Sequence, residues 1–192
     1  MNQKQKYQYY WDKASEEIWK ILEKNIKKED RICEVGCAGG HFLAKLYEED
    51  YKNLSGVEIR EDEIKRTEQD FVTQGIIVKF INKNVLDVQE KYDVVFTTGL
   101  LQCFKESARA TLMQHLSKMA KKTIIVVPEI CEDRNDSSEQ AVAVDGCEEF
   151  ITGNFEWELS KYYSVVRSGK LNKEKIGLKD NFLYFVCEMA GE

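Results

Sequence analysis

The sequence predicts an α/β fold: a doubly wound, mostly parallel seven-stranded sheet with an antiparallel hairpin at its C-terminal edge. Short, largely apolar runs alternate with segments of helical spacing between residues 31 and 127, the pattern of parallel strands covered by helices on both faces. Two further strand-like runs, YYSVV and NFLYFVCEM, follow near the C-terminus. Their polar connection is too short for a helical crossover, so we expect this pair to be antiparallel.

The composition indicates one soluble globular domain. The chain has 192 residues, of which 43% are hydrophobic and 32% charged, enough apolar material for a sizeable core. No apolar run approaches the roughly 20 residues of a membrane span, and the polar start MNQKQKYQYYWDK lacks the apolar segment of a secretory signal. We therefore expect a cytoplasmic protein with no membrane partner. The net charge of −6 does not favour a nucleic acid partner, because phosphate binding needs a basic surface.

The first part of the chain alternates helices and strands. Apolar residues recur at helical spacing over 14–26, 42–47 and 61–72, and in the last of these Ile64, Thr67 and Phe71 share one face. The β-rich runs RICEVG (31–36), LSGVEI (54–59) and IIVKFI (76–81) lie around these helices. This order predicts β-strands joined by helical crossovers, which are right-handed in nearly all known cases.

The alternation continues in the second part. YDVVF (92–96) and TIIVV (123–127) are the fourth and fifth strands, and the latter ends at the only proline, Pro128. The helix between them, 105–120, is expected to bury Ala108, Leu112, Leu116 and Met119. The segment 132–140 contains no apolar residue and is predicted to be a surface loop.

The distribution of the cysteines predicts that they are reduced thiols. Six are scattered along the chain without a C-x-x-C pair: Cys33, Cys37, Cys103, Cys131, Cys147 and Cys187. In a chain without a secretory signal, this distribution is typical of buried thiols and not of a disulfide framework. Because the two histidines, His41 and His115, lie far from any cysteine cluster, no metal site is predicted.

The segment EVGCAGG (34–40) carries the chemical information. It lies where the first strand ends and the next helix begins, and its small residues let a ligand approach the backbone. Glu58 ends the second strand, and a carboxylate there can accept both hydroxyls of a ribose. A dinucleotide-binding G-x-G-x-x-G would need glycines at Ala38 and His41, so NAD binding is disfavoured, and no phosphate-binding G-x-x-x-x-G-K-[ST] is present.

Four segments resemble the motifs of class I S-adenosylmethionine-dependent methyltransferases, which have a Rossmann-like sheet. EVGCAGG is similar to their first motif, E/D-x-G-x-G-x-G, with Ala38 at the middle glycine. Glu58 in GVEI matches the acidic residue after their second strand, FINKNVLDV their third-strand motif and KYDVVFTTGLLQCF their fourth. The resemblance covers residues 31–127 with the motifs in order.

The resemblance implies S-adenosylmethionine as cofactor and S-adenosylhomocysteine as product. It implies that Glu58 binds the ribose, that Ile59 lies against the adenine, and that Leu101 and Gln102 lie at the floor of the active site. The residue that contacts the adenine amine is either Asn84 or Asp87. Glu34 either reaches the amino-acid end of the cofactor or forms a hydrogen bond with neighbouring backbone. The residues predicted to bind the cofactor are Glu34, Gly36, Cys37, Ala38, Gly39, Gly40, Glu58, Ile59, Asn84, Val85, Asp87, Thr98 and Gly99.

The N-terminal segment resembles the lids of small-molecule methyltransferases. YYWDKAS (9–15) contains three of the four rings of an aromatic cluster, Tyr7, Tyr9, Tyr10 and Trp11. Aromatic rings suit a sulfonium or an amine through cation–π contact. We predict that residues 1–28 form a helical lid and residues 29–192 the S-adenosylmethionine-binding domain. The alternative is that these rings only attach the N-terminal helix to the domain.

Three residues are candidates for catalysis: Tyr10, His41 and Glu129. His41 opens a helix beside the expected methionine moiety, and the alternative, which the sequence favours, is a surface or helix-start position. Glu129 follows Pro128 at the carboxyl end of the fifth strand, the edge where open sheets bind ligands, and it either orients an amine or is solvated.

The first functional hypothesis is a methyltransferase acting on a small molecule, with nitrogen weakly favoured over oxygen and an amine or sugar-amine as a candidate acceptor. An RNA or protein substrate is the second hypothesis, and a noncatalytic protein that retained a cofactor pocket is the third. Either a monomer or a homodimer is compatible with the sequence.

Overall fold

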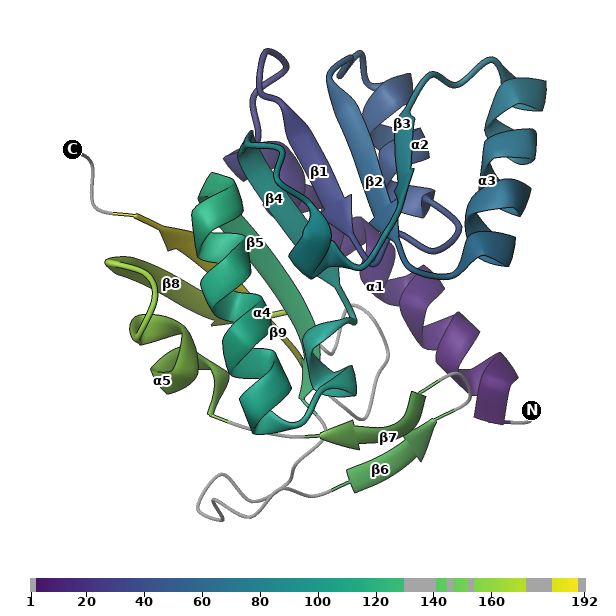
Figure 1. The fold of residues 1–192 in the computed structure, drawn as a ribbon. Coiled ribbons are helices and arrows are strands. Elements are labelled where there is room, and N and C mark those ends of the chain that lie inside the picture. The colour runs from purple at the N-terminus through teal and green to yellow at the C-terminus, as the bar shows by residue number, and fades with distance from the viewer. Residues whose placement is uncertain (1–2, 130–140, 145–146, 152–153, 172–180, 190–192) are drawn as a thin grey trace.

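A seven-stranded sheet forms the centre of the computed structural model, with strand order β3-β2-β1-β4-β5-β9-β8 (Figure 1). Strands β1 to β5 pair in parallel, and β9 pairs antiparallel with both β5 and β8. The predicted doubly wound sheet with an antiparallel C-terminal edge is therefore confirmed. The structure describes the backbone of residues 3–129, 141–144, 147–151, 154–171 and 181–189, and the side chains of 14–127, 154–171 and 182–189.

The elements have the following bounds. The strands are β1 Ile32–Val35, β2 Leu54–Glu58, β3 Lys79–Asn82, β4 Tyr92–Thr98, β5 Ala120–Glu129, β6 Ala141–Val144, β7 Cys147–Ile151, β8 Val165–Lys170 and β9 Asn181–Glu188. The helices are α1 Gln3–Asn25, α2 His41–Glu48, α3 Glu61–Gln74, α4 Glu106–Met119 and α5 Phe155–Ser160, with short 3-10 turns η1 Val85–Asp87 and η2 Leu101–Cys103.

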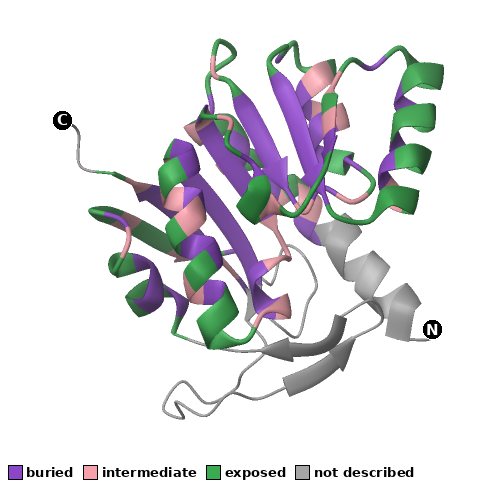
Figure 2. Cartoon of the chain, viewed as in Figure 1, coloured by how far each residue is buried: buried purple, intermediate pink, exposed green. Residues whose placement is uncertain are grey.

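The helices cover the two faces of the sheet and bury most of its central strands (Figure 2). On one face α1, α2 and α3 contribute apolar side chains such as Leu22, Leu43 and Phe71 to a core that includes Phe96 of β4. On the other face α4 and α5 pack on the sheet through residues such as Leu112 and Leu159. No helix in the part of the chain that the structure describes is long and apolar enough to cross a lipid bilayer.

The structure shifts several predicted boundaries and adds elements. Helix α1 begins at Gln3, well before the predicted 14–26, because regular apolar spacing in the sequence starts only at Ala14. Strand β3 comprises 79–82 and β8 165–170, later than predicted. The hairpin β6–β7 and the short helix α5 were missed altogether. The predicted surface loop 132–140 lies outside the described residues.

The predicted set of buried residues on α4 is wrong at one position. Ala108 is exposed, whereas the next residue, Arg109, is 1% exposed. The other predicted positions, Leu112, Leu116 and Met119, are buried as expected. Arg109 is buried because Glu158 of α5 accepts hydrogen bonds from its Nε and Nη2 at 2.7 and 2.8 Å.

The cysteines depart from the predicted reduced state at Cys103. Cys33, Cys37 and Cys187 are free and buried, and burial raises the pKa of the Cys37 thiol far above its ordinary value. Cys103 in η2 is disulfide-bonded, which corrects the prediction for this position. The spacing of the cysteines along the chain carries no signal for this bond.

Replacing Gly56 with alanine is expected to lower the free energy of unfolding by about 1–3 kcal/mol, the usual effect of overpacking a core. A Cβ at this position in β2 would lie 2.8 Å from Cys37 Sγ and 2.9 Å from Leu43 Cδ1. Chemical denaturation measures the change. Gly39→Ala is the control, because a Cβ there meets no atom within 4 Å; equal stability of the two variants would contradict the packing.

Candidate functional site

The candidate site lies at the carboxyl ends of β1 and β4. The chain continues from β1 to β2 and β3 on one side, and from β4 to β5 on the other. The connections that leave β1 and β4 therefore run in opposite directions across the sheet. Ligands of open α/β sheets bind in the crevice that forms where the strand order reverses in this way. In Figure 1 the first half of α1 and the hairpin β6–β7 also lie at this end of the sheet.

The loop 36–40 has a backbone that favours small residues. The φ angles of Gly36, Ala38 and Gly40 are 72°, 41° and 66°, in the left-handed region that glycine adopts without strain. A Cβ on Gly36 would lie 3.0 Å from Leu100 Cδ1, and one on Gly40 would lie 2.8 Å from Phe71 Cζ. Gly39 instead borders open space, since a Cβ on it would have no neighbour within 4 Å.

Hydrogen bonds fix the loop onto β2 and α3. The backbone N–H groups of Gly36 and Cys37 both donate to the carbonyl of Val57, at 2.8 and 3.2 Å. The Ala38 N–H donates to Glu58 Oε2 at 3.2 Å, and the Thr67 hydroxyl of α3 donates to the Ala38 carbonyl at 3.1 Å. Cys37 is buried against Gly56.

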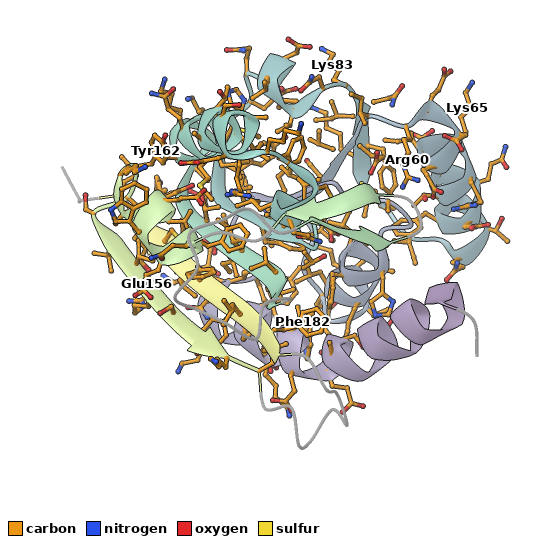
Figure 3. The ribbon with its side chains drawn as sticks, turned by 90° about the horizontal axis from the view of Figure 1, so that it is seen from below. Arg60, Lys65, Lys83, Glu156, Tyr162 and Phe182 are labelled. Carbon is orange, nitrogen blue, oxygen red and sulfur yellow. The ribbon has the colours of Figure 1, made fainter. Side chains whose placement is uncertain are left out.

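Glu58 has its carboxylate held at the end of β2. Its Oε1 accepts the Arg60 backbone N–H at 2.9 Å, and the Arg60 guanidinium at the start of α3 lies 3.5 Å from the same oxygen (Figure 3). The Asn82 side chain donates to the carbonyls of Glu58 and Ile59 at 3.0 and 3.1 Å. The Ile59 side chain is 64% exposed, an apolar surface directly beside a fixed carboxylate.

Glu34 is a buried carboxyl with an unused oxygen. Its side chain is 3% exposed, Thr98 Oγ1 lies 3.5 Å from Oε1, and Oε2 has no hydrogen-bond partner among the described residues. Burial raises the pKa of this carboxyl well above its ordinary value, and the Thr98 hydroxyl offsets the rise only in part. An unpaired buried carboxylate is costly, so a cation placed against it would be bound favourably.

The residues predicted around the adenine lie in the turn after β3. Asn84 is exposed, and its Oδ1 accepts the Leu86 N–H at 3.0 Å as the cap of η1. Val85 and Asp87 are in η1 itself, and Asp87 is exposed. The Asn84 side-chain oxygen thus already accepts one hydrogen bond within the turn.

The fourth-strand segment reaches the site from β4. Thr98 lies within reach of Glu34, and Gly99 has a φ of 70° with its N–H donating to the Val126 carbonyl at 2.8 Å. Gln102 follows in η2 and is 1% exposed. The segment therefore lies beside the glycine loop, which Leu100 contacts at Gly36.

The three predicted catalytic residues are on separate elements. His41 is exposed at the start of α2. Tyr10 belongs to α1, and Glu129 is the last residue of β5, paired with Asn181 of β9. The side chains of Tyr10 and Glu129 lie outside the described residues, so their catalytic roles stay predictions.

Two residues that fix the loop and the strand ends were not predicted as parts of the site, Thr67 and Asn82. Thr67 was placed only on the buried face of its helix, and the spacing did not show that its hydroxyl reaches Ala38. Asn82 occupies the end of β3, where a polar residue after an apolar run is the one available signal. No group of three or more possible metal ligands is present among the described side chains.

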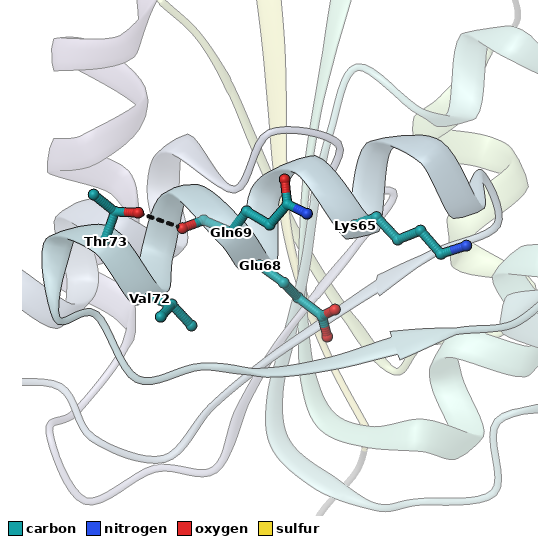
Figure 4. Close-up of a pocket in the computed structure, with 5 residues that line it drawn as sticks. All are labelled: Lys65, Glu68, Gln69, Val72 and Thr73. Atoms are coloured by element: carbon teal, nitrogen blue, oxygen red, sulfur yellow. Dashed lines mark hydrogen bonds between the residues drawn. The ribbon is translucent and has the colours of Figure 1, made fainter.

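A depression on the outer face of α3 is separate from this site (Figure 4). It is lined by Lys65, Glu68, Gln69, Val72 and Thr73. The opposite face of α3, with Ile64, Thr67 and Phe71, packs on the domain. The depression is therefore a surface groove lined by one helix.

Comparison with known proteins decides the family. The profile described as a methyltransferase domain matches residues 26–174. The chain belongs to this methyltransferase domain family. A comparison with curated proteins found no match.

Solved structures share the fold of this methyltransferase at low sequence identity. The PH0226 protein from Pyrococcus horikoshii OT3 has a TM-score of 0.72 and 16% identity, covering 96% of this chain and 92% of its own. An S-adenosylmethionine-dependent methyltransferase from Clostridium acetobutylicum ATCC 824 has a TM-score of 0.68 and 13% identity, with coverage of 96% and 92%.

A third structure carries the cofactor. Magnesium protoporphyrin IX methyltransferase from Synechocystis PCC 6803, with bound S-adenosylmethionine, has a TM-score of 0.63 and 16% identity, covering 94% of this chain and 80% of its own. The predicted family and fold, those of a class I S-adenosylmethionine-dependent methyltransferase, are confirmed.

Proposed function

We propose that this methyltransferase transfers a methyl group from S-adenosylmethionine to a nucleophile of a small molecule, releasing S-adenosylhomocysteine. One observation carries the proposal: Glu34, buried beside the glycine loop, keeps one carboxyl oxygen without a partner among the described residues. The α-ammonium group of the cofactor supplies the cation that this oxygen lacks. The open space at Gly39 supports the same assignment, because a ligand can contact the loop backbone there.

The proposed roles of the other residues follow from their positions. Glu58, at the end of β2, binds the ribose hydroxyls, and the exposed Ile59 packs on the adenine. Asp87 accepts from the adenine amine, while Asn84 caps η1 and shapes the turn. Thr98 and Gly99 border the methionine moiety from the side of β4. The left-handed backbone of loop 36–40 lets the cofactor approach closely.

The bound cofactor supplies an activated methyl group, so the protein contributes mainly positioning and exclusion of water. The nucleophile must lie in line with the sulfonium–methyl bond. A general base is needed only where the acceptor atom is protonated at neutral pH. We propose His41, Tyr10 and Glu129 as the groups that orient or deprotonate the acceptor, with nitrogen favoured over oxygen.

The acceptor is proposed to be a small molecule, such as an amine or a sugar-amine. The acidic chain, with a net charge of −6, offers little to a nucleic acid. The Synechocystis neighbour is named for a porphyrin substrate, and this agrees with the proposal. We further propose that residues 1–28 cover the bound acceptor as a lid, since the first half of α1 lies at the carboxyl end of the sheet (Figure 1).

Calorimetric titration with S-adenosylmethionine and S-adenosylhomocysteine tests the proposal. Glu58→Ala is expected to weaken binding by roughly 1.5–3 kcal/mol, the contribution of a charged hydrogen bond, or about 10- to 150-fold in Kd. Gly39→Ala is expected to weaken binding at unchanged stability, because its methyl group enters the space assigned to the cofactor. Glu61→Gln, with Glu61 exposed on α3, is the control. Failure of the wild-type protein to bind either ligand would overturn the proposed function.

A further inference from the structure

Gln102 has a buried amide without a partner. Its side chain is 1% exposed, and neither Oε1 nor Nε2 forms a hydrogen bond among the described residues. Burying an amide without hydrogen bonds is unfavourable, and fewer than one in ten buried polar groups is left so in folded proteins. A glutamine that served only packing would be better replaced by an apolar side chain, so this amide points to a ligand.

The position of Gln102 is set by the elements around it. Leu100, two residues before Gln102, contacts Gly36 of the glycine loop. After η2, the carbonyl of Phe104 accepts a hydrogen bond from Arg109 Nη1 at 3.1 Å, and this fixes the end of the turn. Strand β7 packs against η2, and Figures 1 and 3 show the hairpin β6–β7 at the carboxyl end of the sheet. The turn that carries Gln102 therefore lies next to both the glycine loop and the hairpin.

The chemistry of an amide restricts what it can bind. Oε1 accepts one or two hydrogen bonds and Nε2 donates two, so both atoms are satisfied only by a ligand that offers a donor and an acceptor together. An ammonium group leaves Nε2 unpaired, and a carboxylate leaves Oε1 unpaired. The carboxamide itself is neutral and cannot balance a buried charge. Vicinal hydroxyls or a second carboxamide satisfy both atoms.

We propose that Gln102 is a positioning residue that binds a neutral group of the methyl acceptor, either vicinal hydroxyls or a carboxamide. This rests on the proposed function and deepens it, because it specifies a second recognition element besides the atom that is methylated. A polyhydroxylated amine or an amide-containing acceptor satisfies both requirements. Gln102 acts through hydrogen bonds that hold the acceptor, while the methyl transfer occurs at another atom of the same molecule.

The test uses the full chain, saturated with S-adenosylhomocysteine and labelled with ¹⁵N, and four small probes. Acetamide and 1,2-ethanediol represent the proposed groups, and methylammonium and acetate represent the charged alternatives. The side-chain NH₂ signals of Gln102 are assigned by their loss in Gln102→Met. Gln114→Met, an equal substitution at an exposed position of α4, is the control. We expect saturable shifts of the Gln102 signals with acetamide and 1,2-ethanediol only.

The variants separate a binding role from a structural one. If the amide is reserved for a ligand, Gln102→Met melts at or above the wild-type temperature, because an apolar side chain of similar size removes an unsatisfied polar group. A fall of more than about 4 °C would show that the amide is satisfied within the fold and would overturn the inference. Shifts caused by methylammonium or acetate, or by no probe, would overturn it as well. If S-adenosylhomocysteine itself does not bind, the proposed function fails first.

Discussion

Replacing Arg109 with methionine is expected to lower the free energy of unfolding by about 3–5 kcal/mol, the usual effect of removing one partner of a buried ion pair. Arg109 donates to both carboxyl oxygens of Glu158 at 2.7 and 2.8 Å, and the side chains are 1% and 8% exposed. The variant leaves Glu158 buried without its counter-charge. It also removes the hydrogen bond to Phe104 and the guanidinium contact with the Phe155 ring.

The control is an ion pair of similar length on the surface. Arg167 donates to Glu188 at 2.7 Å, with side chains 56% and 31% exposed. Arg167→Met is expected to change stability by no more than about 1 kcal/mol, because solvent screens an exposed pair. The double variant Arg109→Met with Glu158→Leu is expected to regain much of the loss, since no charge is then left buried. Chemical denaturation measures the free energy of unfolding of all three variants. Equal effects of Arg109→Met and Arg167→Met would contradict the stabilising role of the buried Arg109–Glu158 pair.

Replacing Glu34 with glutamine is expected to have opposite effects on stability and on cofactor binding. At neutral pH and without cofactor, the variant is expected to be more stable, because it removes a buried carboxyl whose ionised form lacks a partner at Oε2. Its affinity for S-adenosylmethionine is expected to fall by at least about tenfold, the lower end of the contribution of a charged hydrogen bond. Thermal denaturation and calorimetric titration give the two values.

The stability effect depends on pH with a defined sign. Burial raises the pKa of Glu34 in the folded protein above its ordinary value, so the folded state binds more protons than the unfolded state between these two values. The stability of the wild type therefore falls as the pH rises through that window, relative to Glu34→Gln. Glu61→Gln, which removes an exposed carboxylate on α3, is the matched control for the change of charge. A wild-type profile parallel to that of Glu34→Gln would contradict the shift.

The central sheet could be predicted from the sequence because its signals are local. Apolar strands such as TIIVV are buried on both faces, so nearly every residue in them is apolar and the run stands out from its neighbours. The loop EVGCAGG was equally visible, because left-handed backbone requires small residues at positions 36, 38 and 40. The hairpin β6–β7 was missed, although the sequence has an Asp-Gly pair at 145–146 between two short runs, a pair that favours hairpin turns.

The sequence by itself determined the order of the elements, the glycine loop and the family motifs, all of which depend on neighbours in the chain. Tertiary structure alone decided the partners of the polar side chains. Arg109 meets Glu158 across 49 residues, and Thr67 reaches Ala38 across 29. The isolation of Glu34 Oε2 and the Gln102 amide is also a tertiary property. Whether a buried polar atom has a partner depends on distances between elements, which spacing along the chain does not encode.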